Sequence, residues 1–386
     1  MISKTLLVEG WRGINHSYAM VNQYQLLELK NRTINLYHKD VSFYRNSWNS
    51  TQNFCGFNPV EMQKIESIPR PTKGVIPDVT YRIGFPYNLK PPKYGRLFVF
   101  GTSECQILTG EMIPAGDRSF QFNKLPLTII TPSNWSKIGF LNAGFDEKQV
   151  IVVSHGVDLS IFKPLDGVLR ANFRRLIGAD EASFVLLSVG AMTGNKGIDI
   201  LLSAYMQLKG KYPQLKLALK DQSGLYGLYA KDLLLQYCSQ RNIDPSSNAM
   251  VEILAGIIFV EDNLSLVQLN GLYNACDCYV SPYRAEGFNL PPLEAAAAGV
   301  PVIVTKGGAT DDYVQPSFAL LIESQKKSEN SQSYLEPNIE SLMEQIEALI
   351  NKKTFSINPQ NAREFIANNL SWGIVCDELI RKMELN

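Results

Sequence analysis

Short runs of apolar and β-branched residues alternate with segments of helical periodicity along most of this chain. A short apolar run bounded by polar or turn residues is typical of a buried strand, whereas apolar side chains three and four positions apart indicate a helix. We expect strands at residues 5–8, 96–100, 127–130, 149–153, 183–190, 215–219, 276–280 and 301–305. We expect helices at residues 15–30, 133–143, 198–210 and 338–351.

The alternation of strands and helices indicates the fold class. Such a pattern is typical of parallel sheets that are covered by helices on both faces. It occurs as two series, separated at 'SHGVDLSIFKPL' (residues 154–165). We therefore predict an α/β protein with two doubly wound, Rossmann-like domains. The polar residues 323–333 predict a solvated loop, and residues 45–75 favour a plain surface segment over a substrate lid.

Composition and charge narrow the class of protein. The chain has 386 residues, of which 45% are hydrophobic and 19% charged, as in ordinary globular proteins. Lys plus Arg and Asp plus Glu both number 37, and this neutrality disfavours nucleic-acid binding. It still allows a local basic patch, so a peripheral contact with the inner membrane face stays open.

Hydropathy and cysteine usage point to a cytoplasmic protein. No apolar run reaches the roughly 18 residues that span a bilayer. The apolar run before Glu9 is too short for the core of a signal peptide. Six cysteines are scattered through the chain without a CxxC pair, which predicts reduced core residues rather than disulfides or metal ligands.

The loops that would bind phosphate do not match the standard fingerprints. Residues 190–197, 'GAMTGNKG', and residues 10–17, 'GWRGINHS', contain glycines at other spacings than GxGxxG. No GxxxxGK[ST] sequence occurs. The chain is therefore disfavoured as an NAD-dependent dehydrogenase or a P-loop enzyme.

The segment 'SPYRAEGFNLPPLEAAAAGVPVIVT' (residues 281–305) carries the most specific signal. A buried strand leads into a loop with Glu286 and Gly287, and two prolines then suit the first turn of a helix. The helix N-terminus favours an anion, and Gly287 lets the backbone approach a ligand closely. Glu286, in the loop, and Glu294, in the expected first turn of the helix, would repel a bare phosphate, but carboxylates accept hydrogen bonds from sugar hydroxyls. The combination favours a sugar nucleotide, with Glu286 on the transferred sugar and Glu294 on the ribose. The alternative is that Glu286 is solvated and that Glu294 only complements the helix dipole.

This segment resembles the signature of glycosyltransferase family four, in which Gly-Phe follows the first of two glutamates separated by seven residues. Three further segments resemble the family, and all four occur along the chain in the family's order: 'TPSNWSKIGFLNAGFDEKQVIVVSHGVDLSIFKP' (131–164), 'SVGAMTGNKGIDILLSAY' (188–205) and 'FIANNLSWGIVCDELI' (365–380). The resemblance implies the GT-B fold, with an interdomain cleft between two Rossmann-like domains. It implies an acceptor-side domain at 1–160, a donor-binding domain at 161–368, and a terminal helix at 369–386 that crosses back to the first domain.

The resemblance also implies an activity, that of the retaining glycosyltransferases of bacterial polysaccharide biosynthesis. Such an enzyme uses neither a cofactor nor a metal. The expected donor is a nucleotide-sugar, with a UDP-hexose such as UDP-glucose favoured over GDP-mannose. The expected acceptor is a glycan or a lipid-linked sugar.

The family's functional residues can be carried over by position. Lys196 should neutralise the diphosphate leaving group, and Glu286 should bind the donor sugar. His16 lies beside Gly13 at the expected N-terminus of a helix, where it is either structural or, as our own hypothesis, an aid to leaving-group departure. The expected donor-binding residues are Gly13, Asn15, His16, Gly190, Lys196, Glu286, Gly287, Phe288, Asn289, Leu290 and Glu294.

One departure from the family keeps other functions under consideration. The family usually has Arg directly after the glycine of the phosphate loop, where this chain has Ala191. The cations that would replace this Arg are Arg12, His16, Lys220 and Arg284. If none does, the alternative is a sugar-nucleotide-binding protein without transfer activity. A sugar-nucleotide epimerase of the same two-domain architecture is the other alternative.

Overall fold

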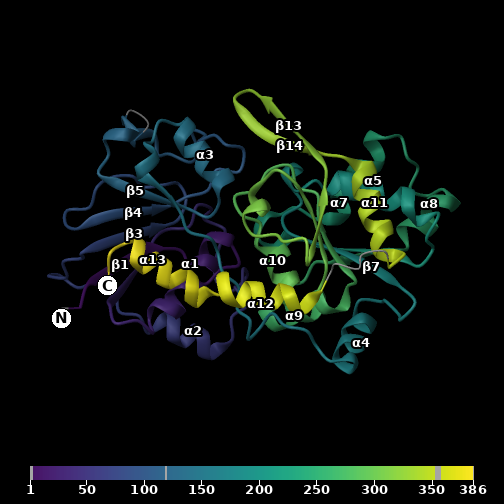
Figure 1. The fold of residues 1–386 in the computed structure, drawn as a ribbon, viewed down its shortest axis with the longest axis horizontal. Coiled ribbons are helices and arrows are strands. Elements are labelled where there is room, and N and C mark those ends of the chain that lie inside the picture. Colours follow the sequence, from purple (N-terminus) through teal and green to yellow (C-terminus); the bar gives the residue numbers. More distant parts are fainter. Residues whose placement is uncertain (1–2, 118–119, 353–357, 386) are drawn as a thin grey trace. The chain divides into compact units, whose positions relative to one another are not determined.

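The computed structural model describes residues 3–117, 120–352 and 358–385, and it divides the chain into two compact units (Figure 1). The first unit consists mainly of the residues up to Gly156 and those from Asn368 onward. The second unit consists of Val157–Glu329 and Ser333–Ala367. Each unit contains its own six-stranded sheet.

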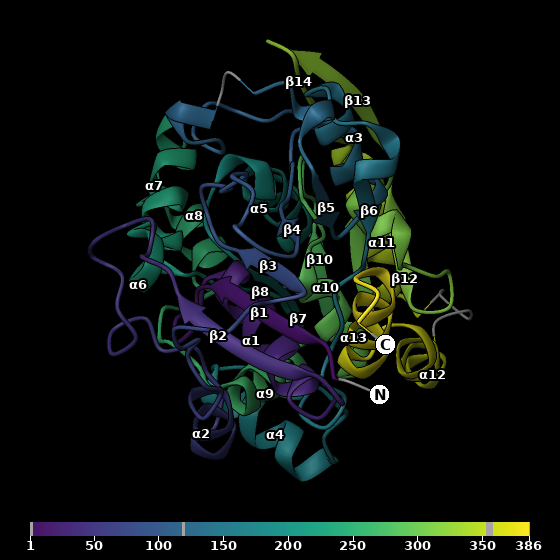
Figure 2. The same ribbon diagram turned by 90° about the vertical axis from the view of Figure 1, so that its left-hand side faces the viewer.

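The first unit has a parallel sheet with the strand order β2-β1-β3-β4-β5-β6 (Figure 2). Its strands are β1 (Thr5–Gly10), β2 (Asn35–Asp40), β3 (Val79–Ile83), β4 (Arg96–Phe100), β5 (Leu127–Thr131) and β6 (Val150–Val152). Its helices are α1 (Ser17–Leu29), α2 (Pro59–Glu66), α3 (Asn134–Asn142) and α13 (Trp372–Lys382). Helix α13 packs against α1, where Trp372 stacks on Tyr24 and Arg32 pairs with Asp377 at 2.9 Å. The last helix of the chain is therefore part of the first unit.

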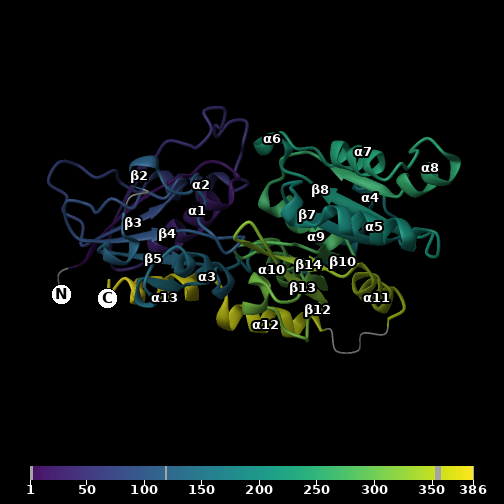
Figure 3. The same ribbon diagram turned by 90° about the horizontal axis from the view of Figure 1, so that it is seen from above.

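The second unit has a parallel sheet with the strand order β12-β11-β10-β7-β8-β9. Figure 3 labels β12, β10, β7 and β8 of this sheet. Its strands are β7 (Phe184–Val189), β8 (Leu215–Lys220), β9 (Ile257–Val260), β10 (Cys278–Ser281), β11 (Val302–Thr305) and β12 (Ala319–Ile322). Its helices are α4 (Gly167–Leu176), α5 (Ile198–Lys209), α6 (Ser223–Tyr226), α7 (Ala230–Gln240), α8 (Asn248–Leu254), α9 (Leu266–Ala275), α10 (Leu290–Ala297), α11 (Ile339–Ile350) and α12 (Pro359–Asn369). The prediction of an α/β protein with two doubly wound parallel sheets is confirmed.

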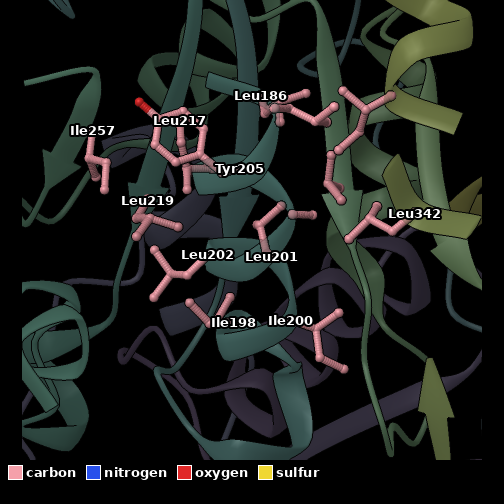
Figure 4. Packing of buried hydrophobic residues seen from close by; sticks show 14 of the residues in the cluster. Leu186, Ile198, Ile200, Leu201, Leu202, Tyr205, Leu217, Leu219, Ile257 and Leu342 are labelled. Carbon is pink, nitrogen blue, oxygen red and sulfur yellow. The ribbon is translucent and has the colours of Figure 1, made fainter. Parts of the chain in front are cut away.

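Helices cover both faces of the second sheet. Strand residues such as Leu186 and Leu217 join side chains of α5, α7 and α11 in one hydrophobic cluster (Figure 4). The neighbouring strand residues Val185 and Leu187 are equally buried but point to the opposite face, where α10 packs against β10 and β11. Burial on both faces explains why these strands read as continuous apolar runs.

The apolar positions expected on the helix after β7 are the core side of α5. Ile198, Leu201, Leu202, Tyr205 and Leu208 are all 2% exposed or less. Burying one such aliphatic side chain contributes roughly 1.5–3 kcal/mol. This packing fixes the axis of α5, and with it the loop that precedes the helix.

A hairpin stands where the sequence indicated a solvated loop, so that expectation is wrong. Strands β13 (Ser324–Glu329) and β14 (Gln332–Pro337) form a two-stranded sheet. Asn330 and Ser331 connect them with φ angles of 51° and 66°, the left-handed conformation that tight hairpin turns need. Most of β13 is exposed and all of its residues are polar. The strand therefore lacks the apolar residues by which a strand is recognised in a sequence.

The remaining elements are short turns of 3-10 helix. They are η1 (Ala115–Asp117), η2 (Phe122–Lys124), η3 (Glu147–Gln149), η4 (Gly194–Lys196) and η5 (Ala309–Asp312). Among the helices that the structure describes, none combines the length and the apolar character that crossing a membrane requires.

Candidate functional site

The first part of the candidate site is the loop between β7 and α5. It begins at Gly190, whose N–H donates to the carbonyl oxygen of Lys220 at 3.0 Å, and it ends at Gly197. Gly197 has a φ of 67°, and a Cβ atom there would overlap the carbonyl oxygen of Pro282. Only glycine therefore lets this loop lie so close to the loop after β10. Between these ends, η4 carries Asn195 and Lys196.

The second part is the loop between β10 and α10. Glu286, Gly287 and Phe288 lead to Asn289, which is the N-cap of α10 and has a left-handed φ of 71°. Two contacts hold Asn289 in this conformation: its Nδ2 donates to Ser281 Oγ at 2.9 Å, and its carbonyl oxygen accepts from the hydroxyl of Tyr313 at 2.6 Å. The loop therefore enters Leu290, the first residue of α10, by a defined path.

Hydrogen bonds fasten the two loops together. The carbonyl oxygen of Asn195 accepts from the N–H groups of Arg284 and Ala285, at 2.7 and 3.3 Å. The side-chain amide of Asn195 donates to the carbonyl oxygen of Ala285 at 3.0 Å. Arg284 also forms a two-pronged ion pair with Asp199, in the first turn of α5. Sequence position alone could not show these contacts, because the loops are about 90 residues apart.

This fastening brings together the lysine and the first glutamate of the predicted site. The ammonium group of Lys196 lies 2.7 Å from Glu286 Oε1. Glu286 is only 7% exposed, and the ammonium group of Lys196 offsets the charge of its carboxylate. The pair is a polar centre at the carboxyl ends of β7 and β10, where open α/β sheets bind ligands.

The second glutamate lies deeper in α10 than the sequence indicated. Glu294 is the fifth residue of the helix rather than a residue of its first turn. Its Oε2 accepts from the hydroxyl of Tyr273 on α9, at 2.8 Å. Burial raises the pKa of Glu294 from 4.5 to about 7, and the hydrogen bond from Tyr273 lowers it only in part. Tyr273 was not foreseen, because nothing in the sequence around it signals this contact.

The remaining predicted residues lie in the loop between β1 and α1 of the first unit. Gly13 has a left-handed φ of 85°, and its N–H donates to Gln23 Oε1 at 2.8 Å. The N–H of Asn15 donates to the carbonyl oxygen of Asn53 at 3.0 Å. The structure thus brings Gly13, Asn15 and His16 together in one loop, within a different unit from Lys196 and Glu286.

His16 is the N-cap of α1 and belongs to an aromatic cluster. Its Nδ1 accepts from the N–H of Tyr18 at 3.2 Å, so the proton of the neutral ring is on Nε2. Its ring centroid lies 5.0 Å from those of both Trp11 and Trp48. Burial, with a smaller contribution from Arg45, lowers its pKa to about 4. At neutral pH His16 is therefore an uncharged hydrogen-bond donor and not a cation.

Two of the other cations considered in place of an Arg at Ala191 are already neutralised. Arg12 holds Asp40 through two hydrogen bonds, at 2.6 and 3.0 Å. Arg284 forms ion pairs with both Asp199 and Glu336, and these two carboxylates raise the pKa of its guanidinium. Lys220 has no ion pair with any Asp or Glu in the described part of the chain.

Comparison with known families identifies most of the second unit. Residues 170–368 match the family described as Glycosyl transferases group 1. The chain is 30% identical over 169 residues to a D-inositol 3-phosphate glycosyltransferase of Segniliparus rotundus, which is 42% of this chain and 33% of that protein. It is 28% identical over 163 residues to the lipopolysaccharide core biosynthesis mannosyltransferase LpsB of Rhizobium meliloti, 42% of either chain. The chain thus spans less than half the length of these relatives.

Solved structures resemble the chain over its whole length. The structure of Anabaena HepE in complex with UDP and glucose has a TM-score of 0.68 at 15% identity and covers 99% of both chains. WaaG, a glycosyltransferase involved in lipopolysaccharide biosynthesis, has a TM-score of 0.64 at 14% identity and covers 98% of this chain and 99% of its own. At such identities the likeness establishes the fold, which is GT-B.

Proposed function

Because this chain belongs to the family of group 1 glycosyl transferases, we propose that it transfers a hexose, with retention of configuration, from a nucleotide-sugar to an acceptor hydroxyl. The proposed donor is a UDP-hexose such as UDP-glucose, and the proposed acceptor is a glycan or glycolipid of polysaccharide biosynthesis. The proposal includes neither a cofactor nor a metal ion.

One observation carries this proposal: Lys196 and Glu286 form an ion pair at the carboxyl ends of two adjacent parallel strands. A diphosphate leaving group needs a cation, and a sugar ring needs hydrogen-bond acceptors. When a donor enters, Lys196 turns to a phosphate oxygen and Glu286 accepts hydrogen bonds from sugar hydroxyls. Until then, the ion pair keeps both charges compensated.

Transfer requires one bond to break and one to form. The bond between the anomeric carbon and the β-phosphate oxygen breaks, and the electron pair leaves with the phosphate. The acceptor oxygen bonds the anomeric carbon on the same face, and its proton passes to the departing phosphate oxygen. Lys196 stabilises the charge that develops on that oxygen, an interaction that is stronger in the transition state than before it.

Two other residues have supporting roles in the proposal. Glu294 binds the ribose. The hydroxyl of Tyr273 donates a hydrogen bond to one carboxylate oxygen of Glu294 and thereby orients the group. His16 donates a hydrogen bond from Nε2–H to the leaving group and keeps its proton, a role that its neutral state allows.

The donor is inferred from the comparisons and is the first point to test. HepE was solved in complex with UDP and glucose, whereas LpsB is named a mannosyltransferase. UDP-glucose and GDP-mannose should therefore be incubated in parallel with a panel of oligosaccharide and lipid-linked acceptors. A new glycoside that has the same anomeric configuration as the donor supports the proposal. Transfer in the presence of EDTA supports metal independence.

The same experiment separates the alternatives. Donor that is bound but returned unchanged would favour the binding protein without transfer activity, an alternative that Ala191 keeps in view. A new epimer without acceptor would favour the epimerase. Inverted products or no binding of either donor would contradict the proposal.

A further inference from the structure

The last residue of β8 is a lysine whose side chain is almost entirely buried. Lys220 is 6% exposed, although lysine is among the residues that are almost never fully buried unless paired. Its ammonium group donates to the carbonyl oxygen of Asp221, the residue just beyond the strand. This contact sets the ammonium at the carboxyl edge of the sheet.

The ammonium group of Lys220 has no carboxylate in direct contact within the described part of the chain. Asp221 is the adjacent residue, but its two carboxylate oxygens accept from the backbone N–H groups of Ser223 and Ala230, at 3.1 and 3.0 Å. Asp262, after β9, acts only through its charge. Burial therefore lowers the pKa of Lys220 against the opposing effect of these two charges. A buried ammonium in such surroundings is costly, and an anion would relieve the cost.

Lys220 adjoins the first loop of the candidate site. It is the register partner of Val189, the last residue of β7, and its carbonyl oxygen holds the N–H of Gly190 at 3.0 Å. The loop that starts at Gly190 contributes one cation, Lys196, whose charge Glu286 already offsets. Each phosphate of a nucleotide-sugar carries a negative charge, so a second cation is needed near this loop.

We propose that Lys220 is a second cation of the donor site and binds the diphosphate of the nucleotide-sugar beside the loop of residues 190–197. This inference rests on the proposed function and assigns a ligand contact to a residue outside that loop. In this arrangement Lys196 serves the leaving oxygen, while Lys220 approaches the diphosphate from the neighbouring strand. Lys220 thereby supplies the positive charge that an arginine at position 191 would provide.

The test compares Lys220→Met with Lys216→Met. Lys216 precedes Lys220 by four residues on β8, points to the same face, and donates to the carbonyl oxygen of Gly178 at 2.7 Å, so it is a matched control. Binding of UDP, UMP and uridine, with the GDP series in parallel, is measured by isothermal titration calorimetry. A charge-assisted hydrogen bond predicts that K220M weakens UDP binding about tenfold or more and leaves uridine binding unchanged. K216M should bind all three as the wild type does.

The melting temperature of the unliganded protein distinguishes binding from a structural role. Removing a buried ammonium should leave the melting temperature of K220M equal or higher, while the stabilisation by UDP falls. A second variant, Lys220→Arg, keeps the charge and should retain tighter UDP binding than K220M even if K220M folds poorly.

Three results would overturn the inference, and they separate it from the proposed function. UDP binding by K220M at wild-type affinity refutes the role of Lys220 alone. An equal loss of UDP and uridine binding, with a lower melting temperature, also refutes it, because it indicates a structural lysine. If the wild type binds neither UDP nor GDP, the proposed function fails and this inference fails with it.

Discussion

Replacing Glu294 with glutamine should make the stability of the protein less dependent on pH. Burial raises the pKa of Glu294 from 4.5 to about 7 in the folded protein. The unfolded chain keeps the ordinary value, so within this window the folded protein binds more protons than the unfolded chain. The free energy of unfolding contributed by Glu294 therefore falls as the pH rises from 4.5 to about 7, and it levels off above that.

The size of the effect follows from the pKa. A shift from 4.5 to about 7 corresponds to about 3 kcal/mol, at roughly 1.4 kcal/mol per pKa unit. Glutamine resembles the protonated acid in charge, and its amide oxygen can still accept from Tyr273. Glu294→Gln should therefore equal the wild type near pH 4.5 and exceed its free energy of unfolding by up to about 3 kcal/mol near pH 8.

Urea unfolding over this pH range provides the assay. All four tryptophans, Trp11, Trp48, Trp135 and Trp372, belong to the first unit, so far-UV circular dichroism is the better probe of the second. Glu344→Gln, on the exposed side of α11, is the control and should differ little from the wild type at any pH. A difference between E294Q and the wild type that stays constant with pH would refute the reasoning.

Three further predictions address the loops of the candidate site. Lys196→Met should lower the turnover of sugar transfer by about 10²–10³-fold, the usual effect of losing one group that stabilises the transition-state charge. Lys211→Met, which removes an exposed ion pair with Glu347, should not affect transfer, and equal turnover of the two variants would contradict the role of Lys196. Gly197→Ala should lower the free energy of unfolding by more than about 1 kcal/mol in thermal melts, because of its φ of 67° and its overlap with Pro282. Gly210→Ala, at a φ of –64° with open space around it, should be neutral or stabilising, and similar effects at both glycines would be inconsistent with this explanation. His16→Ala should reduce turnover, whereas His16→Asn restores the N-cap but not the Nε2 donor; wild-type turnover in H16N would eliminate the role of the Nε2 hydrogen bond.

The parts of the fold that could be predicted are those that local patterns determine. Helix α5 has apolar residues at helical spacing, and α3 begins after Ser133, whose side chain caps it as its residue type suggests. Strands buried on both faces, such as β7 and β11, read directly as apolar runs. In each case the local sequence and the tertiary environment favour the same structure.

Other parts of the fold could not be predicted, either because they depend on contacts between distant residues or because exposed strands lack the apolar pattern. One of the two buried residues of strand β2 is the polar His38, so this strand has no apolar run, and β13 is polar throughout. The pairing of Lys196 with Glu286 joins residues 90 positions apart; the family resemblance placed both in the donor site but did not indicate that they contact each other. The depth of Glu294 in α10 was missed because Leu290, before the two prolines, already belongs to the helix.

The stacking of Trp372 on Tyr24 has a consequence for biosynthesis. The first unit takes up α13, which is synthesised only after the whole second unit. Until then the part of α1 around Tyr24 lacks its cover, and a nascent chain must keep this apolar surface from aggregating. The second unit, by contrast, can collapse as soon as α12 has formed. The half of the protein that is made first is therefore the half that is finished last.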